Sequence, residues 1–198
     1  IEILLNFMNV NQGGKIGICG ANLYTNELKP NHSYSVKYPS LVNVFFYRSQ
    51  LSSVFKKLDV FNKSEKVKDV AIIIGADLFT SRALFEMIEG FDPFFFMYIE
   101  DGELCYRVKK AGYRIVSVPE AKIMHYQGKS STTGSKMIME VSSYLYYFRK
   151  HHGTFTVIVY RLIELFFAIS KFLMSAIIIN KQKRVAYLKL IKFLIGND

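Results

Sequence analysis

Two short apolar runs constrain the fold of this 198-residue chain more strongly than any other feature of its sequence. They cover residues 15–24 and residues 67–79, and each ends near a Gly-Ala pair. Strands that are apolar along almost their whole length occur in sheets that helices cover on both faces. The two runs therefore predict buried strands of a layered α/β fold, and each ends where a ligand can bind.

Two helices are predicted after the second run. Residues 80–90 begin with a Thr-Ser pair that can cap a helix, carry apolar residues at helical spacing and stop at Gly90. Residues 101–112 have acidic residues in the first turn, lysines in the last turn and Gly112 as the stop. Both segments therefore predict helices.

The remaining parts of the first 132 residues are less regular. Residues 113–119 and residues 121–128 predict two further strands. Residues 25–64 are polar and aromatic without clear periodicity, and they predict a loop with a short helix. Residues 1–15 have the pattern of the middle of a helix, with neither an initiating Met nor a signal peptide. We therefore expect a fragment of a longer protein.

Two adjacent acids, Glu100 and Asp101, directly follow the apolar run of residues 94–99. They suit a cleft better than a buried strand, and the predicted helix places them at a helix N-terminus. There the dipole and the unpaired N–H groups favour an ionised carboxylate by about 0.3–1 kcal/mol. Such a carboxylate can accept a proton from a hydroxyl group as a general base. A second interpretation stays open, in which Asp101 only caps the helix and Glu100 is solvated.

Several short motifs occur in a fixed order around this acid pair. They are Gly75-Ala76 followed by Arg82, then Gly90-Phe91-Asp92, then residues 95–113 and residues 118–130. Together they resemble the acceptor-side half of a family 2 glycosyltransferase, of the bacterial rhamnosyltransferase-like kind that builds cell-surface polysaccharide. Several motifs in one order are far more specific than any one of them.

The resemblance implies a partial GT-A fold of the α/β class, which binds a nucleotide-diphosphate sugar at the carboxyl ends of its strands. It also implies an inverting displacement, in which Asp101 deprotonates the acceptor hydroxyl with Glu100 beside it. The implied acceptor is a polysaccharide or a lipid-linked glycan of the cell envelope. The implied activity is that of a hexosyltransferase.

Four further residues match the family motifs and are candidates for substrate binding: Gly75, Ala76, Asp92 and Arg107. Gly75-Ala76 lets a ligand approach the backbone closely, although a plain strand end explains the pair equally well. Asp92 fits a turn and can also face the acceptor. Arg107 either orients the acid pair or simply bridges Glu103.

His125 is the candidate metal ligand. A lone His on a strand is more often structural, but the resemblance implies that a His after the acid-pair helix completes a site for Mg²⁺ or Mn²⁺. Such an ion stabilises the charge on the leaving diphosphate. The other ligands would come from an Asp-x-Asp motif, which these residues lack. We therefore expect the nucleotide-binding half upstream of Ile1, and the fragment alone to be inactive.

The cysteine content and the charge distribution limit the cellular compartment and the partners that the chain can have. The two cysteines, Cys19 and Cys105, are too few for a disulfide framework or a zinc site and favour a reducing, cytosolic environment. Residues 149–198 contain nine Lys or Arg and two acids, whereas residues 1–148 contain seventeen and fourteen. The excess positive charge at the C-terminal end suits an anionic membrane surface, nucleic acid, or no partner at all.

The apolar stretch of residues 155–179 is interrupted by charges, so no uncharged part reaches the about 20 residues of a membrane-spanning helix. On a helical projection its polar residues share one stripe, and the rest is apolar. The stripe consists of Arg161, Glu164, Ala168, Lys171 and Ser175. This pattern predicts a helix in a membrane interface, with the stripe toward water and the apolar face toward lipid. A core helix packed on the rest of the enzyme is the alternative.

The sequence therefore predicts two regions. Residues 1–132 form the acceptor-side half of a GT-A domain, and residues 133–198 form a helical, basic, membrane-associating region. The expected protein is peripheral to the cytoplasmic face of the inner membrane. A non-catalytic, membrane-bound scaffold related to glycosyltransferases stays open as an alternative. A nucleic-acid partner is not expected, because the basic residues belong to no recognised nucleic-acid-binding module.

Overall fold

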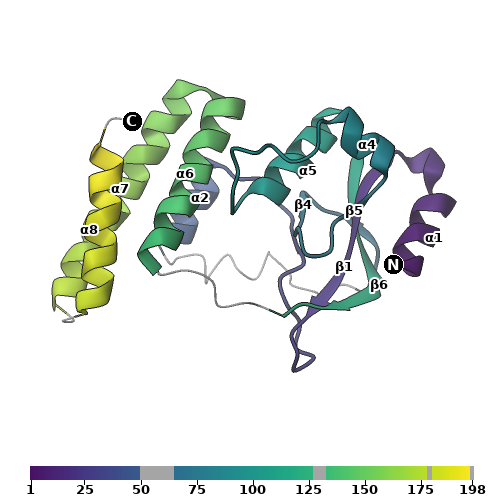
Figure 1. Cartoon of the computed structure of the whole chain (residues 1–198), viewed down its shortest axis with the longest axis horizontal. Helices are drawn as coiled ribbons and strands as arrows, with labels where there is room; N and C mark the ends of the chain where they lie inside the picture. The colour runs from purple at the N-terminus through teal and green to yellow at the C-terminus, as the bar shows by residue number, and fades with distance from the viewer. Residues whose placement is uncertain (50–64, 127–132, 178–179, 197–198) are drawn as a thin grey trace. The chain divides into compact units, whose positions relative to one another are not determined.

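The computed structural model describes residues 1–49, 65–126, 133–177 and 180–196. The chain divides into two compact units (Figure 1). The first unit comprises Ile1–Tyr38, Phe55–Pro93 and Glu100–Gly128, and the second comprises Pro39–Val54, Phe94–Ile99 and Lys129–Asp198. The C-terminal region predicted from residue 133 is therefore joined in the second unit by two earlier segments of the chain.

Within the described residues, the first unit contains a four-stranded sheet in the order β3-β6-β1-β5. Strands β1 (Ile16–Tyr24) and β6 (Arg114–Met124) are parallel neighbours at its centre. The edge strands β3 (Lys68–Asp69) and β5 (Phe79–Thr80) run antiparallel to them. Strand β1 is buried along its length except at its two ends, so the strand predicted at residues 15–24 is confirmed.

Helices cover both faces of this sheet, as Figure 1 shows for α1 (Glu2–Val10) and α5 (Glu100–Lys110). On the α1 face, Leu4 packs with Cys19 and Val116. On the α5 face, Val108 packs with Ile18 of β1 and Ile115 of β6. Close packing requires glycine at two positions of β1. A Cβ atom at Gly20 would lie 2.4 Å from the Ile73 side chain, and one at Gly17 would lie 2.8 Å from three side chains.

The single strand predicted over residues 67–79 is wrong, because this segment supplies three short strands. Lys68–Asp69 forms β3, Ile72–Ile73 forms β4 and Phe79–Thr80 forms β5. Strand β4 pairs with β2 (Tyr34–Ser35) in a separate two-stranded sheet. The chain then turns, since the N–H of Asp77 donates to the carbonyl of Ile74 at 3.0 Å, and this turn carries Gly75 and Ala76.

The two strands predicted at residues 113–119 and 121–128 are one strand, β6, with an irregularity in its middle. Gly20 pairs with Ser117, but Asn22 pairs with Lys122, so extra residues of β6 bulge out before pairing with β1 resumes. Pro119 lies in this irregular part and has no N–H to donate to the ladder. Residues 127 and 128 of the prediction lie outside the described residues.

The helices predicted around the acid pair are confirmed. Helix α4 (Arg82–Met87) is capped by Ser81, whose hydroxyl accepts from the N–H of Leu84 at 3.2 Å. Helix α5 ends before Gly112, which adopts a φ of 86°. The region predicted as loop with a short helix contains β2 and the helix α2 (Leu41–Arg48), and its residues 50–64 lie outside the described residues.

The described part of the second unit is mainly helical, with Phe94–Ile99 as an irregular segment. Its helices are α2, α6 (Thr133–His152), α7 (Thr154–Ile177) and α8 (Lys181–Ile195), and α7 packs against each of the others. The aromatic side chains of Tyr147, Phe148 and Tyr160 are buried in its core. Among the described residues, no helix combines the length and the apolar character that crossing a membrane requires.

The predicted orientation of the polar stripe on α7 is wrong. Glu164 and Ala168 are each 2% exposed and Ser175 is 5% exposed, so the stripe faces the bundle instead of water. The reason is Arg48 of α2, whose guanidinium lies 2.7 Å from the Glu164 carboxylate and 3.1 Å from that of Glu140. This ion pairing makes burial of the charged stripe possible.

Candidate active site

The acid pair opens helix α5, as predicted. The two residues before it, Tyr98 and Ile99, have φ angles of 68° and 70°. A left-handed backbone is rare for any residue except glycine and is strained for a β-branched residue such as Ile99. The strained turn sets the point at which the helix begins, and hence the position of Glu100 and Asp101 at its N-terminus.

Asp101 is held by backbone donors from two elements. Its Oδ2 accepts from the N–H of Gly75 at 3.0 Å, and its Oδ1 accepts from the N–H of Gly102 at 2.6 Å. Burial raises the pKa of Asp101, and these two N–H groups and the nearby His32 offset only part of that rise. Asp101 is therefore an oriented carboxylate with more affinity for a proton than a surface aspartate.

Glu100 is half-buried beside Asp101. Burial raises its pKa, the charge of Asp101 adds to the rise, and the backbone N–H of Glu100 opposes it. Its Oε2 is buried and has no hydrogen-bond partner within the described residues. Glu100 is therefore a carboxyl group with a raised pKa beside Asp101, and one of its oxygens is buried away from solvent.

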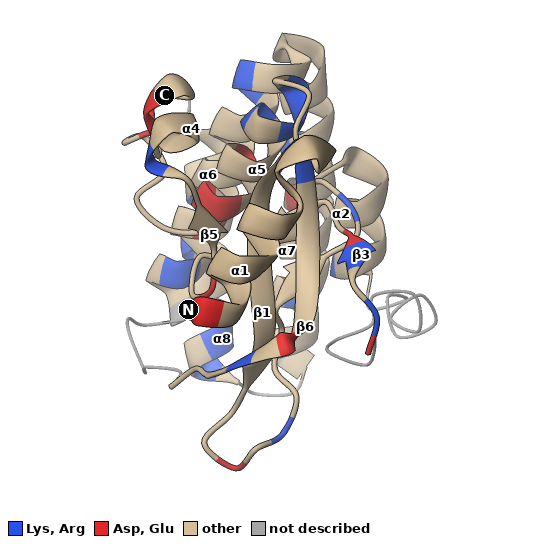
Figure 2. Ribbon diagram, turned by 90° about the vertical axis from the view of Figure 1, so that its right-hand side faces the viewer, with Lys and Arg blue, Asp and Glu red and all other residues tan. Residues whose placement is uncertain are grey.

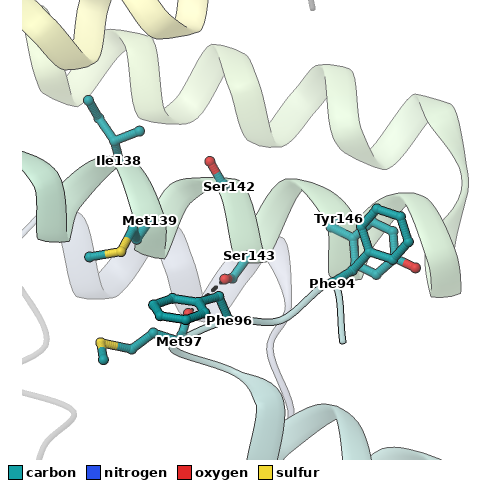
Figure 3. A pocket seen from close by; sticks show the side chains of 8 residues that line it. All are labelled: Phe94, Phe96, Met97, Ile138, Met139, Ser142, Ser143 and Tyr146. Atoms are coloured by element: carbon teal, nitrogen blue, oxygen red, sulfur yellow. Dashed lines mark hydrogen bonds between the residues drawn. The ribbon is translucent and has the colours of Figure 1, made fainter. Parts of the chain in front are cut away.

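The segment before the acid pair is fixed on helix α6 of the second unit (Figure 3). The Ser143 hydroxyl donates to the carbonyl of Met97 at 2.8 Å, and the Phe94 ring stacks on Tyr146 with centroids 4.9 Å apart. An open cavity of about 280 Å³ lies between this segment and α6. Its lining is mainly apolar and includes Phe96, which is 84% exposed.

Asp77 is a site residue that the sequence reasoning missed. It is only 5% exposed, and neither carboxyl oxygen has a partner with full hydrogen-bond geometry within the described residues. Burial raises its pKa to about 8, the charge of Asp101 adds to this rise, and the backbone N–H of Ala21 offsets part of it. An aspartate within an otherwise apolar run, directly after Gly75-Ala76, was the available signal.

His32 was also missed. Its charge lowers the pKa of Asp101, so it lies near that carboxylate, and its own side chain is exposed. It belongs to the connection between β1 and β2, which the sequence pattern indicated only as loop. Nothing in the sequence around His32 relates it to residue 101.

The structure places the predicted substrate-binding residues as follows. Gly75 and Ala76 are exposed in the turn after β4, and Gly75 contacts Asp101. Asp92 is partly exposed in the loop between α4 and α5. Their roles in binding substrate stay predictions.

Arg107 lies on α5 two turns after the acid pair and joins α5 to the end of α4. Its Nε donates to both carboxylate oxygens of the fully buried Glu103, at 3.0 and 2.9 Å. Its other nitrogens donate to the carbonyls of Ile88 and Gly90. These contacts show Arg107 stabilising the fold, and its predicted contact with substrate stays a prediction.

His125 directly follows β6, and its backbone N–H donates to the carbonyl of Tyr24 at 2.8 Å. Its side chain is half-buried. No group of three or more His, Cys, Asp and Glu side chains that could hold a metal ion is found in the described part of the chain. The metal-binding role of His125 stays a prediction. Cys19 and Cys105 are both buried, free thiols.

Comparison with known proteins gives curated relatives that are rhamnosyltransferases. Over 91 residues the chain is 33% identical to N-acetylglucosaminyl-diphospho-decaprenol L-rhamnosyltransferase of Mycobacterium tuberculosis, a match covering 43% of this chain and 29% of that protein. Over 126 residues it is 30% identical to rhamnosyltransferase WbbL of Escherichia coli K12, covering 62% of this chain and 46% of that protein. The matched part thus spans less than half of either relative.

A family model covers more of the chain. The model described as "Glycosyltransferase like family 2" matches residues 5–138, which include all the strands found in the described residues, the acid pair and His125. The match covers more than half of the 198 residues and agrees with the mixed α/β architecture of the first unit. The chain belongs to glycosyltransferase family 2, as its motifs predicted.

Proposed function

We propose that the full-length protein transfers a sugar, with inversion, from a nucleotide-diphosphate donor to a hydroxyl group of a polysaccharide or lipid-linked glycan. Membership of family 2 supports the glycosyl transfer. The names of the relatives support a rhamnose-like donor, and one relative's name supports an acceptor linked to a polyprenyl lipid. Cell-envelope glycan synthesis fits both.

The observation that carries this proposal is the state of Asp101. Its carboxylate is oriented by the N–H of Gly75 and has a raised pKa because it is buried. A general base works best when its pKa is raised toward the working pH but it is still ionised there. Asp101 also contacts the exposed backbone turn at Gly75, where the lack of a side chain on the glycine lets a ligand approach the backbone closely.

In the proposed step, the acceptor hydroxyl donates its proton to Asp101 as its oxygen attacks the anomeric carbon of the donor sugar. The bond between that carbon and the diphosphate oxygen breaks, and the electron pair leaves with the nucleotide diphosphate. Attack from the face opposite the leaving group inverts the anomeric configuration. Glu100 lies directly beside Asp101 at the start of α5, where its carboxyl group contributes to the electrostatic surroundings of the base.

We also propose that a divalent ion, Mg²⁺ or Mn²⁺, stabilises the charge on the leaving diphosphate. The described residues do not by themselves bring together enough ligands to hold one. His125 is the residue proposed to contribute a ligand. No step at Asp101 depends on that ion.

The test of the proposed activity uses the full-length protein, a set of radiolabelled nucleotide-diphosphate sugars that includes a 6-deoxyhexose donor, and glycolipid acceptors. We expect label to move into the acceptor and the new glycosidic bond to have the anomeric configuration opposite to that of the donor. Donor binding without transfer to any acceptor would favour the non-catalytic scaffold. A product that retains the donor configuration would contradict the inverting mechanism.

A further inference from the structure

Helix α7 exposes one uninterrupted apolar face. Its large side chains recur at spacings of three and four residues and are 42–76% exposed. They are Phe155, Ile158, Leu162, Phe166, Ile169 and Leu173, and they define the α7 apolar face. Exposed apolar area of this extent on a single helix marks a surface that contacts another molecule or a lipid phase.

The opposite side of α7 fixes this orientation. Glu164 is buried and ion-paired to Arg48 at 2.7 Å, and Ala168 and Tyr160 are buried next to it. Rotating the helix to hide its apolar face would expose these packed residues and break the ion pair. The α7 apolar face is therefore on the outer side of the bundle, because the opposite side of the helix is packed in the bundle core.

The charge of the second unit identifies the kind of partner. Its described residues include eleven Lys or Arg and two acids, Glu140 and Glu164. Both acids are ion-paired with the same cation, Arg48, and within the described residues of this unit the basic side chains outnumber the acidic ones by nine. Figure 2 shows these basic residues in blue on the ribbon. Such a surface is complementary to an anionic one.

Basic residues stand at both ends of α7. Arg149 and Lys150 close helix α6 immediately before α7. Lys181, Lys183 and Arg184 open α8 immediately after it, and all three are exposed. Apolar side chains flanked by basic residues are the pattern of a helix that lies in the interface of an anionic bilayer.

Helix α8 repeats this pattern on its own outer side. Val185, Leu188 and Ile195 are 46%, 42% and 64% exposed. The exposed Lys189 and Lys192 lie among them. The exposed surface of α8 is thus also both apolar and basic.

We propose that the α7 apolar face lies on the surface of an anionic lipid bilayer, with the basic residues at its ends contacting phosphate headgroups. The helix lies in the plane of the surface and does not cross the membrane. This inference is independent of the proposed glycosyl transfer, because none of its residues belongs to the candidate active site.

The test is flotation of the full-length protein with two kinds of vesicle, one of phosphatidylcholine mixed with phosphatidylglycerol and one of phosphatidylcholine alone. Wild type should float with the mixed vesicles, and added salt should weaken this binding because it screens the headgroup charge. The variant Lys181→Gln, Lys183→Gln, Arg184→Gln should bind the mixed vesicles roughly 100-fold more weakly. The variant Leu162→Gln, Phe166→Gln, Ile169→Gln should bind neither kind.

Matched controls come from exposed residues of the first unit. Lys15→Gln, Lys37→Gln, Lys109→Gln removes the same charge, and Leu28→Gln, Val67→Gln, Met87→Gln removes comparable apolar side chains. Both control variants should float like wild type, and so should Asp101→Asn. Circular dichroism should show all variants folded, since the substituted apolar and basic side chains are exposed and asparagine keeps the size of Asp101.

Two results would overturn the proposal. One is flotation of the α7 variant at the wild-type level. The other is a wild-type protein that does not float but forms a dimer in solution, which the α7 variant converts to a monomer. The second result would assign the face to a second copy of the chain.

Discussion

Asp77 and Asp101 are two carboxyl groups of the first unit with different surroundings. Asp101 receives two backbone hydrogen bonds, whereas Asp77 is more deeply buried without comparable donors. The charge of Asp101 raises the pKa of Asp77 further, to about 8. The backbone donors oppose the rise in the pKa of Asp101, so Asp101 is the better candidate for the base, while Asp77 stays largely protonated at neutral pH.

Asp77→Asn should stabilise the chain in a pH-dependent way. The pKa of Asp77 is about 8 in the folded chain and 3.8 is its ordinary value, so the folded state holds the extra proton between these pH values. Wild-type stability therefore falls as pH rises from about 4 to 8, whereas the asparagine variant has no such loss. The variant's advantage in free energy of unfolding should be near zero at pH 4 and reach several kcal/mol above pH 8, at about 1.4 kcal/mol per pKa unit.

Urea unfolding of both chains across this pH range measures the effect. Asp69→Asn is the control, because a hydrogen bond from Arg114 lowers the pKa of Asp69 below 3.8, so the stability of this variant relative to wild type should not change between pH 4 and 8. The stability that this pair contributes is present above the ordinary pKa of Asp69 and is lost as pH falls. An advantage of Asp77→Asn that does not change with pH would contradict the assigned protonation of Asp77.

His125→Ala tests the metal prediction at the same scale. If His125 is a ligand, the substitution should weaken activation of the full-length enzyme by Mg²⁺ or Mn²⁺ by about 10–100-fold, with little effect on folding. His152→Ala, at the exposed end of α6, should leave the metal titration unchanged. An unchanged titration in His125→Ala as well would make His125 a structural residue.

At the scale of single elements, helix α7 shows what the sequence can and cannot predict. The helical projection correctly grouped its polar residues on one stripe and its apolar residues on the other face. It could not show which side points inward, because the partner of Glu164 is Arg48, 116 positions away in the sequence. Hydrophobicity alone therefore predicted the reverse orientation for the polar stripe.

The strands also show which parts of the fold the sequence pattern could predict. Strand β1 is buried on both faces, so its apolar run identified it unambiguously. The run at residues 67–79 divides among three strands, because β3 pairs with β6, β4 pairs with β2, and a turn at Ile74–Asp77 separates β4 from β5. Periodicity also predicted the helix N-terminus that carries the acid pair. Asp77 and His32 are distant from it in the sequence and lie near Asp101 only in the folded chain, so the local pattern could not predict them.

Arg48→Met tests the buried ion-pair network of the second unit. It would leave the buried carboxylate of Glu164 and the partly exposed carboxylate of Glu140 without their cation, so the free energy of unfolding should fall by about 3–5 kcal/mol. The control is Arg82→Met, which breaks an ion pair whose side chains are 90% and 60% exposed. That change should cost less than about 1 kcal/mol. Equal effects of the two substitutions in urea unfolding would contradict a stabilising role for Arg48.

At the scale of the whole molecule, the two units carry different functions in this account. The first unit holds the acid pair and most of the family match, and the second unit holds the excess basic charge and the α7 apolar face. The chain spans less than half of the curated relatives it matches. The proposed glycosyl transfer therefore applies to the full-length protein. We expect residues that bind the nucleotide-sugar donor outside the residues described.

The most direct measurement of the central claim is the turnover of Asp101→Asn in the full-length enzyme. Asparagine keeps the size of the side chain but cannot accept the proton of the acceptor hydroxyl. We expect kcat to fall by about 10²–10⁴-fold while the Kd of the nucleotide-sugar donor stays near the wild-type value. Asp69→Asn, the same change at an exposed carboxylate, should leave both constants unchanged. Turnover of Asp101→Asn near the wild-type rate would contradict the assignment of Asp101 as the base.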